Sequence, residues 1–361
     1  MLPVICFFEN ETYIYSTDYV LHLCPDSISA TDFLNRIEKE FADEMKVVQV
    51  NFDAYNFEPT KHQTRLYENN KASVFILKTF EILSLTEIAL KQKVNTSSSA
   101  PFQLLVTKNE FLEKVIQIKE MIAAGRFYQV NLTYAFKALL KTNPFDFFLN
   151  HQANYTGNYK AFLPFANHSV ISFSPELFLE KKGLTLKTEP IKGSISKNEN
   201  SDTDLLKSAK EQAELSMIVD LLRNDLNSLE TKSSAQVTKH RQVMNLNYIQ
   251  HTYSEVTIQT EKNMPFILEK MMPGGSISGC PKKESLIAIS ELEPTARSIY
   301  TGGIGFWQKN DFKLNIAIRT FVQTEEAYYY FAGCGIVYDS NPEKEFEELI
   351  NKAGRLNVQY K

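Results

Sequence analysis

Short strand-like segments separated by short turns recur along most of the chain, and this pattern limits the possible folds more than any other feature. Runs rich in β-branched and aromatic residues favour strands. The turns between them leave little room for regular crossover helices. Strands clustered with a few separate helices predict the α+β class, with large antiparallel or mixed sheets. We expect strands at Val47–Phe52, Ser73–Leu77, Gln129–Phe136, Ser169–Ser174, Tyr248–Gln259, Leu314–Val322 and Tyr328–Tyr338.

Helical patterns are few but distinct. Thr107 and Glu110 form a capping-box pattern that precedes apolar residues at helical spacing, so a helix is expected to begin there. Two further strong helices are predicted at Asp202–Leu226 and Pro342–Leu356. The polar, serine-rich stretch Lys93–Pro101 reads as a loop or linker. This stretch divides the chain into an N-terminal region, 1–100, and a larger C-terminal part, 101–361.

Charge and composition exclude several classes of function. The 361 residues include 39 basic and 43 acidic side chains, for a net charge of −4, so a nucleic-acid binder is not expected. Uncharged stretches are too short for a transmembrane helix, and the N-terminus lacks the basic start of a secretory signal. The four cysteines are widely spaced and form no zinc or disulfide pattern. We expect a cytoplasmic protein with a fold of the size common among enzymes, which binds neither nucleic acid nor membrane.

The first long helix carries two glutamates within its apolar arc. Glu211 and Glu214 are three residues apart and share the face that holds Leu215 and Ile218. A carboxylate directed into a core is costly unless it is paired or bound to a metal. The alternative is that the apolar stripe ends here and both glutamates reach solvent.

The C-terminal helix repeats this spacing. Glu345, Glu348 and Lys352 form a stripe along one edge of its apolar arc. The alternative is a solvated pair of Glu348 with Lys352, which stabilises a helix by only a few tenths of a kcal/mol. Two helices with Glu-x-x-Glu at a core edge could instead supply oxygen ligands for a hard cation such as Mg²⁺.

Four further residues permit both functional and structural interpretations. Glu176 follows a strand and a proline, where it could serve as a general acid or as a turn residue. Lys192, between Ile191 and a glycine, could be a nucleophile or a solvent-facing lysine. His251 lies in a strand pattern typical of a structural histidine. Arg319 follows an apolar run and could bind a carboxylate or form a structural salt bridge.

Eight motifs, taken in order, resemble the family of chorismate-utilising enzymes, which includes anthranilate synthase component I, aminodeoxychorismate synthase component I, isochorismate synthase and salicylate synthase. The resemblance runs from about Phe111 to Arg355 and implies a two-sheet antiparallel or mixed core with helices packed outside. It also implies that residues 1–100 are a shortened N-terminal region interwoven with a chorismate-binding catalytic domain at 101–361. The motifs are Gly125–Thr133, Ser174–Phe178, Pro190–Ser194, Glu211–Leu226, Pro273–Lys282, Arg297–Gly305, Asn315–Thr320 and Gly333–Ala353.

The resemblance implies a role for each candidate residue. It implies that Glu214 and Glu348 bind Mg²⁺ directly, with Glu211 and Glu345 as water-mediated or more distant partners. It implies that Glu176 is the general acid. The remaining matches are His251 as an active-site histidine, Arg319 and Tyr300 for the enolpyruvyl carboxylate of chorismate, Gly333 and Gly335 for close approach of the backbone to the substrate, and Ser194 and Lys352 as further substrate contacts.

Two positions distinguish branches of the family. Gln129 stands where the water-activating members carry a lysine, which disfavours isochorismate or salicylate synthesis. Lys192 matches the lysine of aminodeoxychorismate synthases, where anthranilate synthases carry alanine. The resemblance thus implies conversion of chorismate and ammonia to 4-amino-4-deoxychorismate for p-aminobenzoate and folate synthesis. Anthranilate synthase component I is the alternative, and a non-catalytic chorismate-binding subunit is a further one.

Some positions depart from the family pattern. Ser194 replaces the usual threonine and keeps its hydroxyl, Ile195 replaces the usual arginine, and Cys334 replaces the usual alanine. Ile336 breaks the pattern of an amidotransferase nucleophile around Cys334. The sequence also shows no glutaminase segment, so we expect a separate glutamine amidotransferase subunit to deliver ammonia.

Overall fold

The computed structural model describes most of the chain. It covers residues 2–55, 57, 60, 62–91, 94–95, 100–155, 157–196, 209–229, 233–246, 249–353 and 356–360, and for 193–196, 209–211, 213, 245–246 and 249 it describes the backbone only. Most of the serine-rich stretch predicted as a linker therefore lies outside the described residues.

The described strands form one continuous hydrogen-bonded ladder. All pairs are antiparallel except the short pair of β19 with β5. This architecture confirms the predicted α+β class with a large mixed sheet. The strands are β1 (Val4–Phe7), β2 (Tyr13–Leu23), β3 (Lys46–Val50), β4 (Ala72–Leu83), β5 (Phe102–Leu104), β6 (Gln129–Ala138), β7 (Tyr159–Pro164), β8 (His168–Ser174), β9 (Leu177–Lys182), β10 (Thr185–Glu189), β11 (Ile191–Ser196), β12 (Gln236–Leu246), β13 (Ile249–Gln259), β14 (Gly279–Cys280), β15 (Gly303–Gln308), β16 (Asp311–Ile316), β17 (Thr320–Thr324), β18 (Tyr328–Val337) and β19 (Val358–Gln359).

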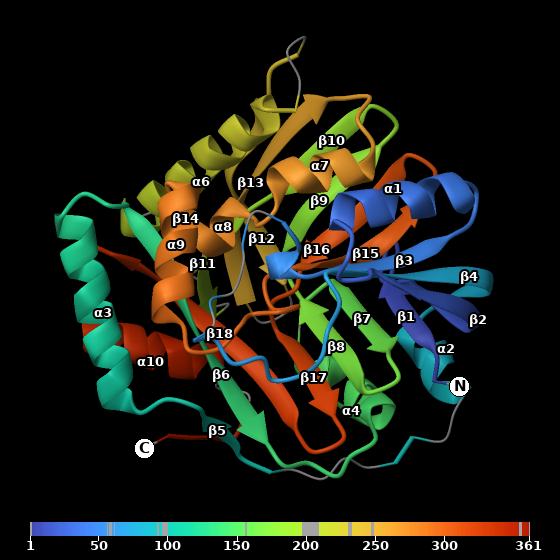
Figure 1. Cartoon of the computed structure of the whole chain (residues 1–361), viewed down its shortest axis with the longest axis horizontal. Helices are drawn as coiled ribbons and strands as arrows, with labels where there is room; N and C mark the ends of the chain where they lie inside the picture. The colour runs from blue at the N-terminus through green and yellow to red at the C-terminus, as the bar shows by residue number, and fades with distance from the viewer. Residues whose placement is uncertain are drawn as a thin grey trace.

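Part of the hydrogen-bonded ladder forms a ring of strands. Its neighbours run β8–β7–β1–β2–β4–β3–β15–β16–β9, and β9 follows β8 in the chain after two residues. Two arms extend from this ring. One runs through β17 and β18 to β6, and the other through β10 to β13, which also pairs with β11 and β12. Figure 1 shows the first arm in the lower half of the molecule and the second in the upper half.

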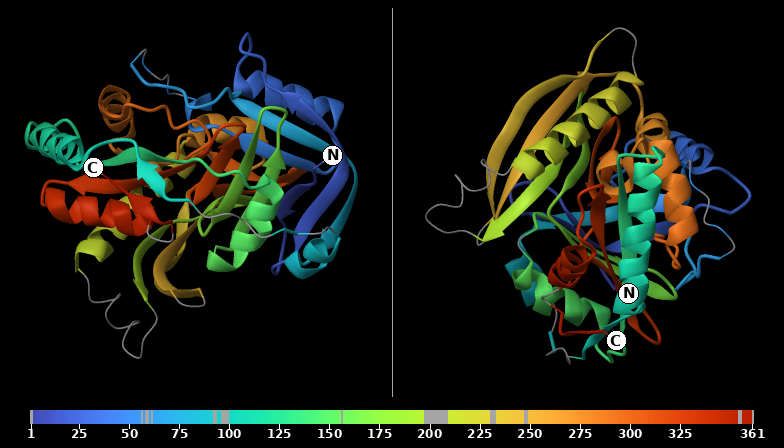
Figure 2. Two further views of the ribbon diagram at one scale, coloured as in Figure 1. Left: turned by 90° about the horizontal axis from the view of Figure 1, so that it is seen from below. Right: turned by 90° about the vertical axis from the view of Figure 1, so that its left-hand side faces the viewer.

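Helices cover these strands. α6 lies along β11, β12 and β13, α3 and α10 pack on each other and on β18, and α9 packs on β6 (Figures 1 and 2). The helices are α1 (Ala30–Glu40), α2 (Leu85–Leu90), α3 (Lys108–Ala123), α4 (Pro144–His151), α6 (Ala209–Asn227), α7 (Met264–Met271), α8 (Gly275–Ser278), α9 (Lys282–Leu292) and α10 (Pro342–Lys352), with short 3₁₀ turns η1 (Phe52–Ala54) and η2 (Gln152–Asn154).

Local sequence explains where the predicted helices begin. At α3 the Thr107 hydroxyl accepts from the backbone N–H of Glu110, whose carboxylate accepts in return from the Thr107 N–H at 2.8 Å. This confirms the predicted capping box. At α10, Asn341 accepts from the Lys344 N–H at 3.1 Å and Pro342 occupies the first turn. Among the described residues, no helix is long and apolar enough to cross a membrane.

Two glycines on β15 provide a test of how closely β15 packs on β16. A Cβ atom on Gly305 would lie 1.8 Å from the Lys313 carbonyl oxygen, whereas a Cβ on Gly303 would meet nothing closer than 3.7 Å. Because backbone atoms in a paired strand cannot move aside cheaply, Gly305→Ala is expected to lower the free energy of unfolding by at least about 2 kcal/mol. Gly303→Ala is the matched control and should shift the urea midpoint little. Equal midpoints for the two variants would contradict this packing.

Candidate active site

The candidate site lies where two paired strands are both interrupted. Pro175 and Glu176 separate β8 from β9, and residues 317–319 separate β16 from β17. β17 pairs with β8 and β16 pairs with β9, so the two interruptions lie side by side. We call this junction the seam. It brings Glu176 and Arg319 to the same place in the sheet.

The second interruption corrects a sequence-based prediction. Leu314–Val322 was expected to be one strand, but Arg319 adopts a φ of 50°, in the left-handed region that a strand cannot continue through. The backbone of Ala317 bonds instead with Thr301 and Gly302, accepting from the first at 2.9 Å and donating to the second at 2.8 Å. Alternating hydrophobicity does not reveal such a break, because the residues on both sides still face the core.

Hydrogen bonds across the seam fix the backbone of Glu176. Proline has no N–H for the ladder, so the strand stops at Ser174. The Ser174 hydroxyl donates to the Ile316 carbonyl at 2.6 Å and accepts from the Glu176 N–H at 3.2 Å. The Ile316 N–H in turn donates to the Glu176 carbonyl at 3.0 Å. The direction of the Glu176 side chain is thus set by both broken strands.

The Glu176 carboxyl group is buried and carries a shifted pKa. Its residue is 6% exposed, and the Ser276 hydroxyl of α8 donates to Oε1 at 3.3 Å. Burial raises the pKa of Glu176 to about 7, while the positive charges of Lys192 and Lys352 and the Ser276 hydrogen bond oppose the rise. A carboxyl group with this pKa holds its proton through part of the neutral range and can donate it, as a general acid must.

Lys192 lies on β11, close enough to Glu176 for its charge to act on that carboxyl group. Its residue is half-buried, and its backbone carbonyl accepts from the Thr252 hydroxyl of β13. His251, 2% exposed, precedes Thr252 on β13 and stands opposite Ser194 in the register. The Ser194 side chain lies outside the described residues, so its predicted substrate contact stays a prediction.

Arg319, Tyr300 and Lys352 gather with Tyr330 beside the seam. Burial raises the pKa of Tyr330, and the charges of Arg319 and Lys352 oppose that rise. Tyr300 is 5% exposed and stacks on Phe331 with ring centroids 5.4 Å apart. The Tyr330 hydroxyl donates to the Lys352 carbonyl at 3.2 Å. Together with Lys192, these cations suit an anionic ligand.

Polar side chains of β6 lie against Gly333 and Gly335 of β18. A Cβ on Gly333 would lie 2.6 Å from the Thr133 hydroxyl oxygen and 2.7 Å from the Asn131 side-chain oxygen. A Cβ on Gly335 would lie 2.6 Å from the Gln129 amide nitrogen. The polar side chains of β6 therefore occupy the face of β18 that the two glycines leave open. Their predicted backbone contacts with substrate stay predictions.

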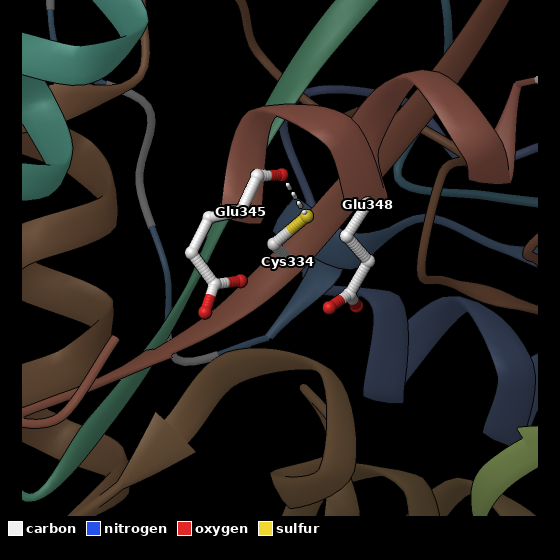
Figure 3. A group of neighbouring side chains, drawn as sticks. All are labelled: Cys334, Glu345 and Glu348. Carbon is white, nitrogen blue, oxygen red and sulfur yellow. Dashed lines mark hydrogen bonds between the residues drawn. The ribbon is translucent and has the colours of Figure 1, made fainter. Parts of the chain in front are cut away.

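Two of the predicted metal ligands converge on α10, beside Cys334 of β18. One ligand atom from each of Cys334, Glu345 and Glu348 lies within 4.8 Å of the others (Figure 3). Glu345 is 4% exposed, and one of its carboxylate oxygens accepts from the Ser340 hydroxyl at 2.7 Å. Carboxylate oxygens are the ligands that Mg²⁺ prefers, so the two glutamates fit such an ion. The solvated pair considered for Glu348 is also present, since Lys352 contacts it at 2.7 Å.

The other two predicted metal ligands, Glu214 and Glu211, lie on α6. Glu214 lies half-buried on α6 and, in the part of the chain that the structure describes, does not join the group formed by Cys334, Glu345 and Glu348. The Glu211 side chain lies outside the described residues. The metal roles of Glu214 and Glu211 therefore stay predictions.

Sequence reasoning missed a buried ion pair that holds β6 in place. Arg297, 1% exposed, contacts the Glu293 carboxylate with two nitrogens, at 2.6 and 2.9 Å. Arg297 also donates to the Asn131 carbonyl at 2.7 Å and to the Ile277 carbonyl of α8 at 2.8 Å, and Glu293 accepts from the Thr133 N–H at 2.9 Å. The sequence signal was the four-residue spacing of Glu293 and Arg297, which carry opposite charges.

Comparison with known proteins gives consistent results. A family model described as chorismate binding enzyme matches residues 19–357. Aminodeoxychorismate synthase component 1 of Bacillus subtilis is 34% identical over 282 residues, which are 76% of this chain and 59% of that protein. Anthranilate synthase component 1 of Lactococcus lactis is 36% identical over 290 residues, 77% of this chain and 63% of that protein. The chain thus spans about three fifths of the length of these curated relatives.

Solved structures share the fold. Anthranilate synthase component I from Streptococcus pneumoniae superposes with a TM-score of 0.83 at 26% identity, covering 96% of this chain and 92% of that chain. The menaquinone-specific isochorismate synthase of Escherichia coli superposes with a TM-score of 0.76 at 18% identity, covering 98% of this chain and 88% of that chain. The second likeness concerns the fold alone.

The raised pKa of Glu176 predicts how the stability of the protein depends on pH. The carboxyl group has a pKa of about 7 in the folded chain, above the ordinary 4.5, so the native state binds its proton more tightly than the unfolded state does. Its contribution to stability is fully present below pH 4.5 and is lost as the pH rises through 7. Glu176→Gln removes this loss, so the variant should gain about 3 kcal/mol over the wild type between pH 4.5 and pH 8.

Glu180 of β9 provides the matched control. Burial alone would raise its pKa, but Lys187 and Lys313 outweigh burial and lower it. Glu180→Gln should therefore lose stability relative to the wild type as the pH rises, the opposite sign. Urea unfolding at several pH values measures both differences. A pH-independent difference between Glu176→Gln and the wild type would contradict a raised pKa at Glu176.

Proposed function

The chain belongs to the family of chorismate binding enzymes, and from this premise we propose that it is an aminodeoxychorismate synthase component I. In this proposal it converts chorismate and ammonia to 4-amino-4-deoxychorismate, a precursor of p-aminobenzoate and folate. Relatives named aminodeoxychorismate synthase and anthranilate synthase both match at about one third identity, so identity does not separate the two activities. The choice between them rests on the site.

One observation carries the choice. Lys192, in the motif that distinguishes the two branches, lies where its charge acts on the buried carboxyl of Glu176. A nucleophile and a general acid near one another are what substitution at a ring carbon requires. An alanine at position 192 would leave only the acid.

The proposed reaction has two displacements. The Lys192 amine forms a bond to C2 of chorismate, the ring double bond shifts, and the C4–oxygen bond breaks. Glu176 gives its proton to the departing hydroxyl, which leaves as water. Ammonia then adds at C4, the double bond shifts back, and the bond from Lys192 to C2 breaks, so that the lysine returns as an amine. Chorismate and ammonia thus yield 4-amino-4-deoxychorismate and water.

Other residues bind and orient the substrate in this proposal. Arg319 and Tyr300 hold the enolpyruvyl carboxylate, and Lys352 and Ser194 contact the ligand near the ring. His251, buried beside Lys192 on the neighbouring strand, completes the wall of the site. Glu345 and Glu348 of α10, with Glu214 and Glu211 of α6, would hold Mg²⁺, which when bound neutralises the ring carboxylate.

Ammonia requires a source. Relatives carry the name component 1, which supports a multi-subunit enzyme. We propose that a separate glutamine amidotransferase subunit supplies ammonia and that the complex works in the cytoplasm. Free ammonium salts should then replace the partner in vitro.

The product of the reaction tests the proposed function. Purified protein with chorismate, Mg²⁺ and ammonium is expected to form aminodeoxychorismate, identified by chromatography and mass. Omitting ammonium is the control, since the second displacement then has no nucleophile. Anthranilate as the main product would make the chain an anthranilate synthase component I. Chorismate binding without any turnover would support a non-catalytic chorismate-binding subunit instead.

Lys192 has its own test. Lys192→Ala should lower ammonia-dependent product formation at least about 100-fold, because it removes the proposed nucleophile. Lys182→Ala changes an exposed lysine of β9 that pairs with Glu9 on the surface and should leave the rate unchanged. With chorismate and no ammonia, the wild type alone should gain the mass of the covalent adduct on the peptide that contains Lys192. Wild-type turnover in Lys192→Ala would rule out the covalent step.

A further inference from the structure

We propose that Cys334 is a metal ligand, and that with Glu345 and Glu348 it forms a site that takes a thiophilic divalent ion such as Zn²⁺ or Co²⁺. The inference deepens the proposed function, because this site shares two glutamates with the one proposed for Mg²⁺. The binding itself can be tested without chorismate or turnover.

The three ligand atoms converge from two elements. Cys334 is fully buried on β18, and Glu345 and Glu348 lie one helical turn apart on α10, which packs on that strand. Figure 3 shows the two carboxylate groups extending to the same side, with the sulfur above them beside the Glu345 carbonyl. The Cys334 thiol also contacts the Glu345 carbonyl at 3.3 Å, which keeps the sulfur close to α10.

The spacing suits a metal ion. Three atoms that lie within 4.8 Å of one another share a point no more than about 2.8 Å from each. Bonds from zinc are about 2.3 Å to sulfur and about 2.0–2.2 Å to carboxylate oxygen. Small rotations of the two glutamate side chains bring their oxygens from that distance to metal-bond length. The half-exposed Glu348 leaves the site open to solvent on one side, where an ion can enter.

The chemistry of the ligand atoms determines for which ion Cys334 raises the binding affinity. A thiolate is a soft ligand that favours zinc and other transition metals, whereas Mg²⁺ is hard and binds oxygen. Cys334 should therefore add affinity for Zn²⁺ and Co²⁺ and little for Mg²⁺. Under the proposed function, Mg²⁺ supports turnover and a thiophilic ion bound through Cys334 competes with it.

One cation already contacts the group. Lys352 pairs with Glu348 at 2.7 Å and donates to the Gly333 carbonyl at 2.8 Å. Both side chains of this pair are 47% exposed, and pairs of that kind contribute little to stability. A divalent ion can therefore displace Lys352 from Glu348 at small cost, while Gly333 retains the lysine nearby.

Cobalt titration of the ligand-free protein tests the inference. Co²⁺ bound through a thiolate produces a sulfur-to-metal charge-transfer band in the near ultraviolet, which carboxylate ligands alone do not produce. The wild type is expected to show this band at one Co²⁺ per chain. Cys334→Ala should abolish it and weaken Zn²⁺ binding at least about tenfold, with Mg²⁺ affinity changed less than about twofold.

Two further variants separate loss of the sulfur ligand from effects of another cysteine or of a disturbed fold. Cys280→Ala is the matched control, because Cys280 is partly exposed and lies near the charges of Asp220 and Asp225, which could hold an ion adventitiously. It should leave the band intact. Cys334→Ser preserves the size of the side chain and should lose the band while the chain stays folded by circular dichroism. A band that survives in Cys334→Ala, or none in the wild type at saturating Co²⁺, would overturn the assignment, whatever product the enzyme makes.

Discussion

The paired interruption of β8–β9 and β16–β17 is the constraint on which the rest of the structure depends. At this junction β8 pairs with β17 and β9 pairs with β16, so both pairs are interrupted at the same place. At the seam the ladder is replaced by four bonds that involve Ser174, Glu176, Ile316, Phe173 and Arg319. The backbone is satisfied there without regular pairing. The break therefore costs little and leaves a carboxyl group and a guanidinium at the junction.

The buried pair of Glu293 and Arg297 supports the other side of the site. A pair this deeply buried loses hydration that only good geometry can offset. Here the offset comes from two contacts between the charged groups and from backbone partners on β6 and α8. Because α8 carries Ser276, which donates to Glu176, the pair connects the acid to the strand that lies against the glycines of β18. The ion pair and the seam thus position the same group of site residues around Glu176, each from a different side.

The sequence predicted elements far better than it predicted their junctions. Strands such as Ser169–Ser174 and Tyr328–Tyr338, and the start of α3 at its capping box, agree closely with the structure because periodicity and caps are local. The break at Arg319 could not be foreseen, since it arises from pairing with residues 301–302. Glu345 and Glu348 were assigned to one stripe, yet the first is buried and the second half-exposed. The position of Cys334 close to both glutamates depends on how α10 packs on β18, which no local pattern encodes.

The environment of Glu176 shows why burial and charge must act together. Burial alone would hold the carboxyl proton too tightly for transfer to a departing hydroxyl, whereas a fully solvated glutamate would have lost it at neutral pH. Lys192 on β11 and Lys352 on α10 both lower the pKa of Glu176 and so oppose the effect of burial. A substrate anion or a metal ion that engages either lysine or its partner alters that electrostatic balance. Under the proposed function, ligand binding at α10 would therefore change the protonation of Glu176 through the charge of Lys352.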